Sequence, residues 1–519
     1  MTVYNAVTWL LDRNVDEGRG EKLAFTDTVS ELTYGELQRQ TCRLANMLRR
    51  LGVRREERVA MIMLDTVDFP IAFLGAIRAG VVPVPLNTLL TSDQYAYVLA
   101  DCRARVLFIS EPLLPGVKDM LGRMPDLDHV IVCGSDAQVF NKHGYKKLSD
   151  ELSGESDVFA TVATHADEPA FWLYSSGSTG MPKGVRHLHS NLPATADTYA
   201  KQVLGIREDD VCLSAAKLFF AYGLGNALTF PMSVGATTIL NTERPTPALM
   251  FKLMNKYNPT IFFGVPTLFS AMLNDEALKS ERGGTRLRLC TSAGEALPES
   301  LGNAWKARFG VDIIDGVGTT ELLHIFLSNA PGDIKYGTAG RPVPGYQVRL
   351  VSEEGSDVAD GEVGELLVHA PSAGDGYWNQ RSKSRSTFEG YWTRTGDKYI
   401  RDAEGRYTFC GRSDDMFKVS GIWVSPFEVE SALITHPAVL EAAVVPEADP
   451  EGLLKPKAYV VLRTDADTDG LREALKEYVK QKIGVWKYPR WIDVVDSLPK
   501  TATGKIQRFK LRDGDAPNP

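Results

Sequence analysis

Short apolar stretches rich in β-branched residues alternate with helical patterns through the first 320 residues of the chain. Such stretches have the length and composition of buried strands, and the longer amphipathic segments between them have the length of crossover helices. The stretches lie at residues 59–64, 81–86, 105–110, 129–134, 171–174, 260–265 and 287–291. Alternation on this scale predicts α/β domains with largely parallel sheets.

One of the intervening helices has a clear start. Thr33 and Glu36 are spaced as a capping box, in which the hydroxyl accepts from an amide of the first turn and the carboxylate reaches back. Leucines then recur at helical spacing, at positions 37, 44, 48 and 51. We therefore expect an amphipathic helix from this point.

The pattern changes near residue 345. Shorter strands at Gln347–Val351, 365–369 and 406–410 stand between Gly, Asp and Glu turns, which predicts a β-rich lobe. The last hundred residues predict a small α+β unit, in which Ser425 opens a second capping box with proline at the first helical position. A chain of 519 residues is also too long for one hydrophobic core. The expected fold is α/β, with a large N-terminal domain and a small C-terminal domain.

Composition excludes several classes of function. The net charge of −8 is modest, and no Lys/Arg block predicts nucleic-acid binding. The six cysteines are scattered without a C-x-x-C pair, which favours free thiols over a disulfide framework or a zinc site. No secretory signal pattern opens the chain, and no apolar run approaches the roughly 20 residues of a membrane helix. We therefore expect a cytoplasmic protein without a membrane span.

A glycine- and hydroxyl-rich loop follows the stretch at residues 171–174. It runs from Ser175 to Gly184 and ends in Pro-Lys-Gly. Glycine permits close approach of backbone amides to phosphate, hydroxyl groups donate hydrogen bonds and Lys183 supplies charge. The spacing is not that of a Walker A loop. A flexible linker is the alternative, but a linker does not usually carry such an end directly after a strand.

Six further blocks follow this loop in a fixed order. They are residues 292–297 (SAGEAL), 318–321 (GTTE), 391–397 (YWTRTGD), 411–415 (GRSDD), 418–421 (KVSG) and 499–506 (PKTATGKI). Together with the loop, the blocks resemble the signature of the adenylate-forming superfamily, which includes acyl-CoA synthetases, luciferase and nonribosomal adenylation domains. The resemblance covers residues 174–506, and the N-terminal alternation agrees with it.

The resemblance implies a binding site for ATP and Mg²⁺. Glu321 would hold Mg²⁺, Thr320 would contact the α-phosphate, and Asp397 would bind both ribose hydroxyls. Arg412 would meet the ribose or a phosphate. The remaining implied nucleotide contacts are Ser175, Ser176, Gly177, Ser178, Thr179, Gly180, Lys183, Gly294, Glu295, Ala296, Gly318 and Thr319. The superfamily often has tyrosine where this chain has Val317, so apolar contacts are expected to replace aromatic stacking on the adenine.

The same resemblance assigns roles near the end of the chain. Lys505 would be the catalytic lysine of adenylation, since an ammonium can bridge the attacking carboxylate and the α-phosphate. Asp414 would be the hinge between an N-terminal domain of residues 1–413, with the ATP, Mg²⁺ and acyl sites, and a mobile C-terminal domain of residues 414–519. Lys418 and Gly421 would face the site when coenzyme A reacts.

Three segments are similar to the benzoate–CoA ligase branch in particular: residues 12–14, 216–226 and 323–329. A benzoate pocket should be short, flat and mostly apolar, with one or two polar groups. The residues expected to form it are Ala221, Tyr222, Gly223, Thr319, His324 and Ile325. No direct role is expected for His187 or His189, just after the phosphate loop.

The predicted function is an AMP-forming ligase that joins an aromatic carboxylate to coenzyme A through an acyl-adenylate. Benzoate, 2-aminobenzoate and hydroxybenzoate are candidate acids, and a cyclohexane carboxylate is an alternative. Loading of a carrier-protein thiol is another alternative, although no carrier domain follows Lys505. A luciferase-type oxygenase would share the blocks, whereas a non-enzymatic relative would be expected to lack Lys505, Glu321 or Asp397. ATP, Mg²⁺ and CoA are the expected cofactors, and a homodimer is left open.

Overall fold

The structure is a computed structural model that describes residues 4–134, 144–175, 181–413, 415–419, 422–463, 470–485, 487–500 and 506–512. These residues form two compact units. One unit contains the chain up to residue 348 together with residues 368–393, and the other contains residues 349–367 together with the chain from residue 394. The expected domain boundary at residue 413 stays a prediction.

The largest sheet of the first unit has nine strands in the described chain, in the order β16-β15-β14-β13-β12-β10-β11-β1-β2. Strands β1, β11, β10, β12, β13 and β14 run parallel, whereas β2, β15 and β16 add antiparallel edges. Their bounds are β1 Leu23–Thr26, β2 Glu31–Thr33, β10 Val211–Ser214, β11 Thr237–Ile239, β12 Ile261–Gly264, β13 Leu289–Ser292, β14 Ile313–Gly318, β15 Ile325–Ser328 and β16 Arg341–Pro342.

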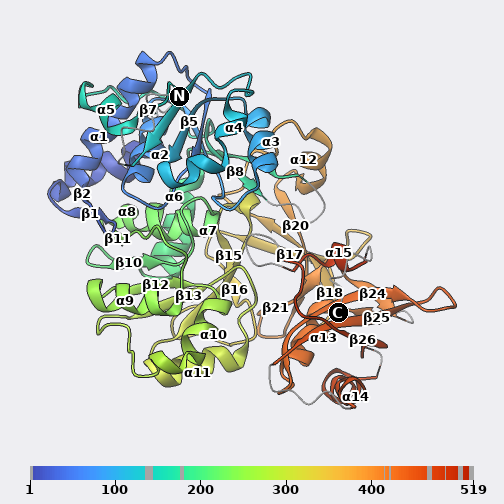
Figure 1. Ribbon diagram of the computed structural model, residues 1–519. Coiled ribbons are helices and arrows are strands. Elements are labelled where there is room, and N and C mark those ends of the chain that lie inside the picture. The colour runs from blue at the N-terminus through green and yellow to red at the C-terminus, as the bar shows by residue number, and fades with distance from the viewer. Residues whose placement is uncertain are drawn as a thin grey trace. The chain divides into compact units, whose positions relative to one another are not determined.

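Helices α9 (Pro247–Tyr257), α10 (Pro266–Asn274) and α11 (Glu299–Phe309) pack against this sheet (Figure 1). Their core is aromatic: Phe269 lies edge-on to both Phe262 and Trp305, with ring centroids 5.5 and 4.6 Å apart. The close packing of these helices on the sheet holds β12, β13 and β14 in place, so the loops that follow these strands begin at fixed positions.

A second sheet of the first unit is entirely parallel, in the order β4-β3-β5-β6-β7. Its strands are β3 Arg58–Ile62, β4 Val82–Pro85, β5 Ala104–Ser110, β6 His129–Cys133 and β7 Lys146–Lys147. Helices α1 (Tyr34–Arg50), α2 (Asp68–Arg78) and α3 (Ser92–Cys102) connect and cover them (Figure 1). The predicted capping box is confirmed: the Thr33 hydroxyl accepts from the Glu36 amide at 3.2 Å, and Glu36 accepts from the Thr33 amide at 2.9 Å.

Several short elements complete the first unit. The hairpin β8 (Pro169–Ser175) and β9 (Lys183–Leu188) stands as a separate antiparallel pair. The remaining helical segments are η1 Thr8–Asp12, η2 Val15–Arg19, η3 Glu111–Gly116, α4 Lys118–Leu121, α5 Leu148–Ser153, α6 Asn191–Thr195, η5 Ala196–Val203, α7 Ala221–Leu224, η6 Gly225–Thr229, α8 Phe230–Val234, η7 Glu276–Leu278, η8 Thr320–Leu322 and α12 Arg381–Thr387.

The β-rich lobe predicted after residue 345 is present as a five-stranded sheet in the described chain. Its order is β17-β18-β20-β19, and β21 pairs with β20. The bounds are β17 Gln347–Val351, β18 Val363–His369, β19 Phe388–Glu389, β20 Trp392–Arg401 and β21 Tyr407–Arg412.

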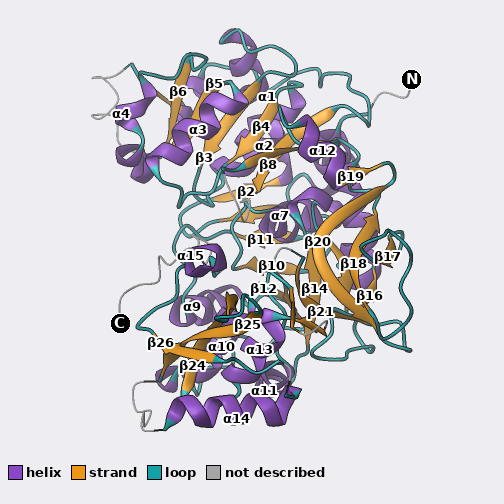
Figure 2. Ribbon diagram, turned by 90° about the vertical axis from the view of Figure 1, so that its right-hand side faces the viewer, coloured by secondary structure: helices purple, strands orange, loops and turns teal. Residues whose placement is uncertain are grey.

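The second unit ends in a small α+β fold, as expected. Strands β24 (Val439–Ala448), β25 (Leu454–Leu462) and β26 (Trp491–Val494) form one sheet, and β22 (Phe417–Val419) pairs with β23 (Ile422–Val424). Helix α13 (Pro426–Ile434) packs on β24, and α14 (Leu471–Ile483) packs on α13 (Figure 2). The short helix α15 (Arg508–Arg512) follows the last described loop.

The second predicted capping box is only half formed. Ser425 accepts from the Glu428 amide at 3.1 Å, and Pro426 occupies the first helical position. Both carboxylate oxygens of Glu428, however, accept from Lys487 at 2.7 Å. A tertiary ion pair with a lysine 59 residues away has therefore replaced the local half of the motif.

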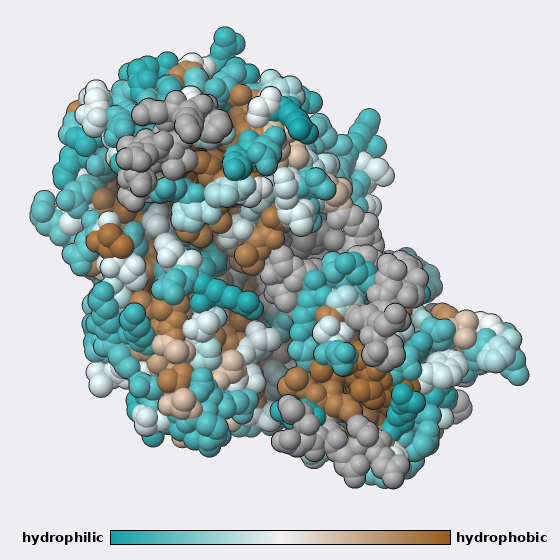
Figure 3. Space-filling view, in the orientation of Figure 1, coloured by the Kyte–Doolittle hydropathy of each residue, from teal (hydrophilic) through white to brown (hydrophobic). Residues whose placement is uncertain are grey.

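Three surface and chemical features agree with the composition. All six cysteines are free thiols, and every one except Cys410 is buried. Among the described residues, no helix combines the length and the apolar character needed to cross a membrane. The face drawn in Figure 3 is mostly hydrophilic, and exposed large apolar side chains such as Val29, Leu89 and Val158 lie far apart in sequence, an ordinary pattern for a globular surface.

Candidate active site

The residues predicted to bind substrate follow the carboxyl ends of neighbouring parallel strands. The chain moves from β10 to β11 on one side and later to β12 on the other, so the direction of the sheet order reverses at β10. Open α/β sheets bind ligands outside the carboxyl ends of strands at such a reversal. The segments after β10, β13 and β14 carry Ala221–Leu224, residues 294–296 and Thr320–Leu322. Topology therefore gathers predicted acyl and nucleotide contacts at one sheet edge.

The predicted phosphate loop joins the two strands of the β8–β9 hairpin. Ser175, the last residue of β8, lies opposite Lys183, the first residue of β9. Ser176, Gly177, Ser178, Thr179 and Gly180 lie outside the described residues. The Lys183 ammonium lies over the ring of Tyr377, 4.9 Å from its centroid. The two ends of the loop are thus held together by strand pairing.

The segment Thr319-Thr320-Glu321 leaves the end of β14. The Thr319 hydroxyl caps η8 by accepting from the Leu322 amide at 3.3 Å. Glu321 is half-buried, and one of its carboxylate oxygens accepts from the Tyr377 hydroxyl at 2.8 Å. The backbone oxygen of Glu321 accepts from the Gly374 amide at 2.8 Å. Both the backbone and the side chain of this predicted metal ligand are therefore fixed.

Glu321 has the chemistry of a Mg²⁺ ligand. Mg²⁺ is commonly held by one or two carboxylates together with phosphate oxygens and water. No cluster of three or more His, Cys, Asp or Glu side chains suited to a metal occurs among the described residues. A single carboxylate beside a phosphate loop fits a metal that ATP brings with it, and does not fit a metal held by protein ligands alone.

Two of the residues predicted to bind the acyl group, Tyr222 and His324, lie in contact. The His324 Nε2–H donates to the Tyr222 carbonyl oxygen at 3.3 Å, and the two rings lie 5.5 Å apart. Phe230 lies edge-on to His324 at 4.5 Å, and Tyr199 lies at 5.5 Å. Burial lowers the pKa of His324 to about 3, so the imidazole is neutral at physiological pH. The Tyr222 hydroxyl and the Thr291 hydroxyl are 2.7 Å apart.

Two glycines make room for this arrangement. A Cβ at Gly225 would lie 2.4 Å from the His324 ring, and one at Gly318 would lie 2.5 Å from the His324 carbonyl oxygen. Real Cβ atoms do not approach so closely, so only glycine lets the helix after β10 and the strand pair β14–β15 enclose the histidine. Gly223 meets a similar limit, because its Cβ would lie 2.0 Å from the Lys217 carbonyl oxygen.

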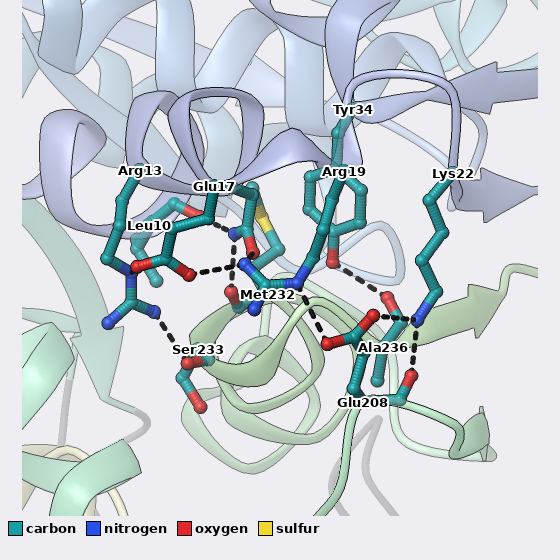
Figure 4. Close-up of polar contacts among 11 residues, drawn as sticks. Leu10, Arg13, Glu17, Arg19, Lys22, Tyr34, Glu208, Met232, Ser233 and Ala236 are labelled. Carbon is teal, nitrogen blue, oxygen red and sulfur yellow. Dashed lines mark hydrogen bonds and ion pairs between the residues drawn. The ribbon is translucent and has the colours of Figure 1, made fainter.

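A polar clamp near the N-terminus anchors the helical run that carries Ala221, Tyr222 and Gly223. The run ends at Val234, and its last carbonyl groups need partners. Asn14 donates to the Met232 carbonyl at 2.8 Å, and Arg13 donates to the Ser233 carbonyl at 2.6 Å. Figure 4 shows the Arg13 side chain reaching the Ser233 carbonyl at the helix end, and Arg19 nearby between Glu17 and Glu208. The segment 12–14, noticed only for its resemblance, therefore fixes one end of the predicted acyl-binding helix.

The two predicted ribose contacts lie together in the second unit. Asp397 on β20 faces Arg412 on β21 across the antiparallel pair, and the Arg412 guanidinium donates to the Asp397 carboxylate at 2.8 Å. The same guanidinium donates to the Thr395 carbonyl at 3.2 Å. Ribose hydroxyls would therefore meet a carboxylate that is already oriented by an arginine.

Four residues predicted in the C-terminal region are described in part or not at all. Lys505, Asp414 and Gly421 lie outside the described residues, and Lys418 is described only as backbone in β22. Arg508, three residues after Lys505, is well held: it donates to Glu430 at 2.9 and 2.7 Å and to Asp415 at 3.3 Å. These contacts anchor the chain on the far side of the predicted catalytic lysine.

The histidines after the phosphate loop are buried and neutral. Burial lowers the pKa of His187 and of His189 to about 4. The His187 ring stacks on Phe171 at 4.9 Å, and the His189 Nδ1 accepts from the Ala6 amide at 3.1 Å. Both histidines therefore contribute to packing and hydrogen bonding within the fold.

Sequence reasoning missed two polar residues at this edge. Tyr377 bonds to Glu321 from 56 residues away, and the glycine-rich G-D-G-Y-W stretch around it was the one available signal. Asp315, in the middle of β14, accepts from the Leu297 amide at 3.4 Å and so supports the loop that carries residues 294–296. Burial raises the pKa of Asp315 to about 8, so this carboxyl group is largely protonated at neutral pH.

Comparison with known proteins identifies the family. The AMP-binding enzyme family matches residues 11–378, and the AMP-binding enzyme C-terminal domain matches residues 428–505. The chain belongs to the AMP-binding enzyme family. This AMP-binding enzyme is 55% identical to a 4-hydroxybenzoate–CoA/benzoate–CoA ligase of Rhodopseudomonas palustris, over 98% of the chain and 94% of the relative. It is 54% identical to a benzoate–CoA ligase of Thauera aromatica, over 98% and 96%.

Solved structures agree with this assignment. A benzoate CoA ligase from Burkholderia xenovorans LB400 superposes with a TM-score of 0.89 at 50% identity, covering 98% of this AMP-binding enzyme and 100% of that chain. The anthranilate CoA ligase AuaEII in complex with anthranoyl-AMP gives a TM-score of 0.92 at 42% identity, covering 99% and 97%. The expected fold class, the expected family and the expected enzyme class, an AMP-forming acid–thiol ligase, are confirmed.

Proposed function

We propose that this enzyme activates benzoate or a small ring-substituted benzoate with MgATP and transfers the acyl group to coenzyme A. The observation that carries the proposal is the packing of Tyr222 against His324, three residues after Glu321. An acid whose ring packs against this pair of side chains would have its carboxylate near the carboxyl end of β14, where the predicted phosphate contacts begin.

The first half-reaction joins the acid to AMP. A carboxylate oxygen attacks the α-phosphorus of ATP, the bond to the bridging oxygen of pyrophosphate breaks, and pyrophosphate leaves with that electron pair. Negative oxygens crowd together in this step, so catalysis depends on neutralising and orienting them. Bound Mg²⁺ would supply part of that neutralisation. Thr320 would orient the α-phosphate, Lys183 would add positive charge, and Glu321 would hold the metal.

Other residues would hold the nucleoside. Gly294, Glu295 and Ala296 follow β13 at the same sheet edge as residues 318–321, where adenine could lie between the two loops. Gly294 and Glu295 are exposed and Ala296 is half-buried. Asp397, oriented by Arg412, would accept hydrogen bonds from both ribose hydroxyls, a geometry that suits a carboxylate.

His324 would set the choice of acid. The neutral imidazole offers one donor and one acceptor. Its Nε2–H donates to the Tyr222 carbonyl, and its Nδ1 has no hydrogen-bond partner in the described part of the chain. The His324 Nδ1 is therefore a hydrogen-bond acceptor in apolar surroundings. A small donor on the ring of the acid, such as a hydroxyl or amino group, can bond to this nitrogen, and with an unsubstituted ring a bound water can do so.

The second half-reaction requires the site to be rearranged. The coenzyme A thiol attacks the acyl carbonyl, the bond from that carbon to the AMP oxygen breaks, and AMP leaves. We propose that Lys505 supplies the positive charge for adenylation. Residues 414–519 would then rotate about Asp414, so that the lysine leaves the site before coenzyme A reacts. Lys418 and Gly421 would border the pantetheine arm. Clusters of the kind formed by Arg508, Glu430 and Asp415 would keep such a domain rigid while it moves.

A panel of acids tests the proposal. Pyrophosphate release and CoA thioester formation would be measured with benzoate, 2-aminobenzoate, hydroxybenzoates, fluorobenzoate, cyclohexane carboxylate and butyrate. The expected result is thioester formation with benzoate and its small substituted forms, and none with butyrate. Thioester formation from cyclohexane carboxylate at the same rate as from benzoate would contradict the proposal that the pocket selects a flat aromatic ring. Pyrophosphate release without any CoA thioester would favour loading of a carrier-protein thiol.

A further inference from the structure

Tyr377 connects the two groups that the proposed reaction places around the phosphates of ATP. Its hydroxyl donates to a carboxylate oxygen of Glu321 at 2.8 Å, and its ring lies under the Lys183 ammonium at 4.9 Å. The residue is only 6% exposed. One buried residue thus contacts both the predicted metal ligand and the cation at the end of the phosphate loop.

The backbone holds Tyr377 firmly in this place. Residues 375–378 run beside β9: the Asp375 amide donates to the Arg186 carbonyl at 2.8 Å, and the Trp378 amide donates to the Gly184 carbonyl at 2.8 Å. Tyr377 itself pairs with Val185. The strand that begins with Lys183 therefore sets the position of the tyrosine.

Neighbouring side chains add further restraint. The Tyr377 amide donates to the Ser384 hydroxyl at 2.9 Å. Next in sequence, the Trp378 indole donates to the Asp101 carbonyl at 2.9 Å and packs on Trp172 at 4.8 Å. Because the backbone of Tyr377 is held on both sides, its phenol reaches Glu321 from a fixed point in the chain, and the carboxylate orients to it.

This arrangement matters because Glu321 sits in η8, a single short turn. A glutamate there has rotatable bonds that would let its carboxylate leave the metal position. A hydrogen bond to one oxygen fixes the plane of the carboxylate and leaves the other oxygen for the cation. Partners of this kind typically change metal affinity or activity by about 10–100-fold when they are removed.

We propose that Tyr377 is a positioning residue for adenylation: its hydroxyl orients the Glu321 carboxylate toward the metal of MgATP, and its ring couples that carboxylate to Lys183. The inference rests on the proposed role of Glu321 as the Mg²⁺ ligand. It assigns the tyrosine no contact with substrate and no part in proton transfer.

The test uses the full-length enzyme with benzoate and ATP. In Tyr377→Phe the ring remains over which Lys183 lies, and only the hydroxyl is lost. We expect the Mg²⁺ concentration for half-maximal pyrophosphate release to rise about tenfold, with the KM for benzoate unchanged and the rate restored by excess Mg²⁺. Calorimetry should show weaker ATP binding with Mg²⁺ present and unchanged binding without it. Unchanged Mg²⁺ dependence would overturn the inference.

Tyr95→Phe is the matched control. Tyr95 is 5% exposed, and its hydroxyl donates to the Asn87 carbonyl at 2.8 Å, so the substitution removes a hydrogen bond from a similarly buried tyrosine of the same unit. Its Mg²⁺ dependence should equal that of the wild type. Tyr377→Leu removes the ring as well and should weaken ATP binding even without Mg²⁺, because Lys183 loses its support.

Two further variants separate the possible failures. Glu321→Gln should lose Mg²⁺-dependent adenylation; if it keeps full activity, the proposed role of Glu321 is wrong. If Glu321→Gln is inactive while Tyr377→Phe titrates like the wild type, only the inference about Tyr377 is wrong. In Glu321→Asp the shorter side chain already breaks the contact, so adding Tyr377→Phe should change little. Fully multiplicative effects in that double-mutant cycle would contradict the coupling, even if Tyr377→Phe were less stable.

Discussion

Arg508 binds Glu430 in a forked ion pair, with hydrogen bonds of 2.9 and 2.7 Å between guanidinium and carboxylate. The Glu430 side chain is 6% exposed and that of Arg508 is 19% exposed. The pair ties the chain just after residue 505 to helix α13, and Glu430 also accepts from the Val444 amide at 2.7 Å. The segment predicted to deliver the catalytic lysine is therefore anchored to the core of the second unit.

Arg508→Met should destabilise this unit, because it leaves a nearly buried carboxylate without its partner. Breaking a buried pair on one side costs about 3–5 kcal/mol, and pyrophosphate release should fall with it. Arg349→Met is the matched control: the Arg349–Asp357 pair of the same unit has a similar length of 2.8 Å, but its side chains are 36% and 66% exposed. It should cost less than about 1 kcal/mol. Equal denaturation midpoints for the two variants would contradict this role.

His324→Ala should change the choice of acid without changing the use of ATP. Removing the ring opens space beside Tyr222 and Phe230, and contacts of this size discriminate by about 1–3 kcal/mol. The ratio of kcat/KM for 4-substituted benzoates over benzoate should rise, while the KM for ATP stays the same. His187→Phe, equally buried but in β9, should keep the wild-type preference. An unchanged profile in His324→Ala would place His324 away from the acyl group.

His187 should make the stability of the first unit depend on pH. Burial lowers its pKa to about 4 from an ordinary value of 6.5. Between these values the unfolded chain binds a proton that the folded chain does not, so stability falls as pH falls, by up to about 1.4 kcal/mol per pH unit. His187→Phe removes this contribution. Denaturation at several pH values should show that the free energy of unfolding of the variant, relative to that of the wild type, rises by about 3 kcal/mol from pH 6.5 to pH 4. A constant difference would contradict the buried neutral state.

Lys505→Ala should separate the two half-reactions. Pyrophosphate release from ATP and benzoate should be lost, because the α-phosphate loses its bridging cation. Conversion of supplied benzoyl-adenylate to benzoyl-CoA should survive. Lys500→Ala is the control, since Lys500 is a nearby lysine of the same unit that pairs with Glu441 at 2.6 Å. Parallel loss of both half-reactions in folded Lys505→Ala would contradict the assignment.

The strands could be predicted from the sequence because their signal is local. Runs of apolar residues bounded by turns placed β5, β6, β13 and β17 within one or two residues of their observed bounds, and Thr33 with Glu36 marked the start of α1. Long-range partners could not be predicted in this way. Glu428 was expected to bond to its own helix end and binds Lys487 instead.

The same limit applies to the candidate site. The order of the motifs assigned Glu321, His324 and the residues after β10 to one active site. The strand order explains why these residues lie at the same edge of the sheet. Nothing in the sequence around Glu321 indicates Tyr377, because that contact exists only once residues 375–378 lie beside β9. The roles of Lys505, Asp414 and Gly421 rest on their motifs and stay predictions.

The central claim is that the acid passes through an acyl-adenylate on its way to coenzyme A, and oxygen labelling tests it most directly. Benzoate labelled with ¹⁸O in both carboxylate oxygens would be converted with ATP and CoA, and the nucleotide product analysed by mass spectrometry. Because a carboxylate oxygen forms the new bond to the α-phosphorus and stays with it when the thiol attacks, the AMP should carry one ¹⁸O atom. Unlabelled AMP, or ADP with labelled phosphate, would contradict the account.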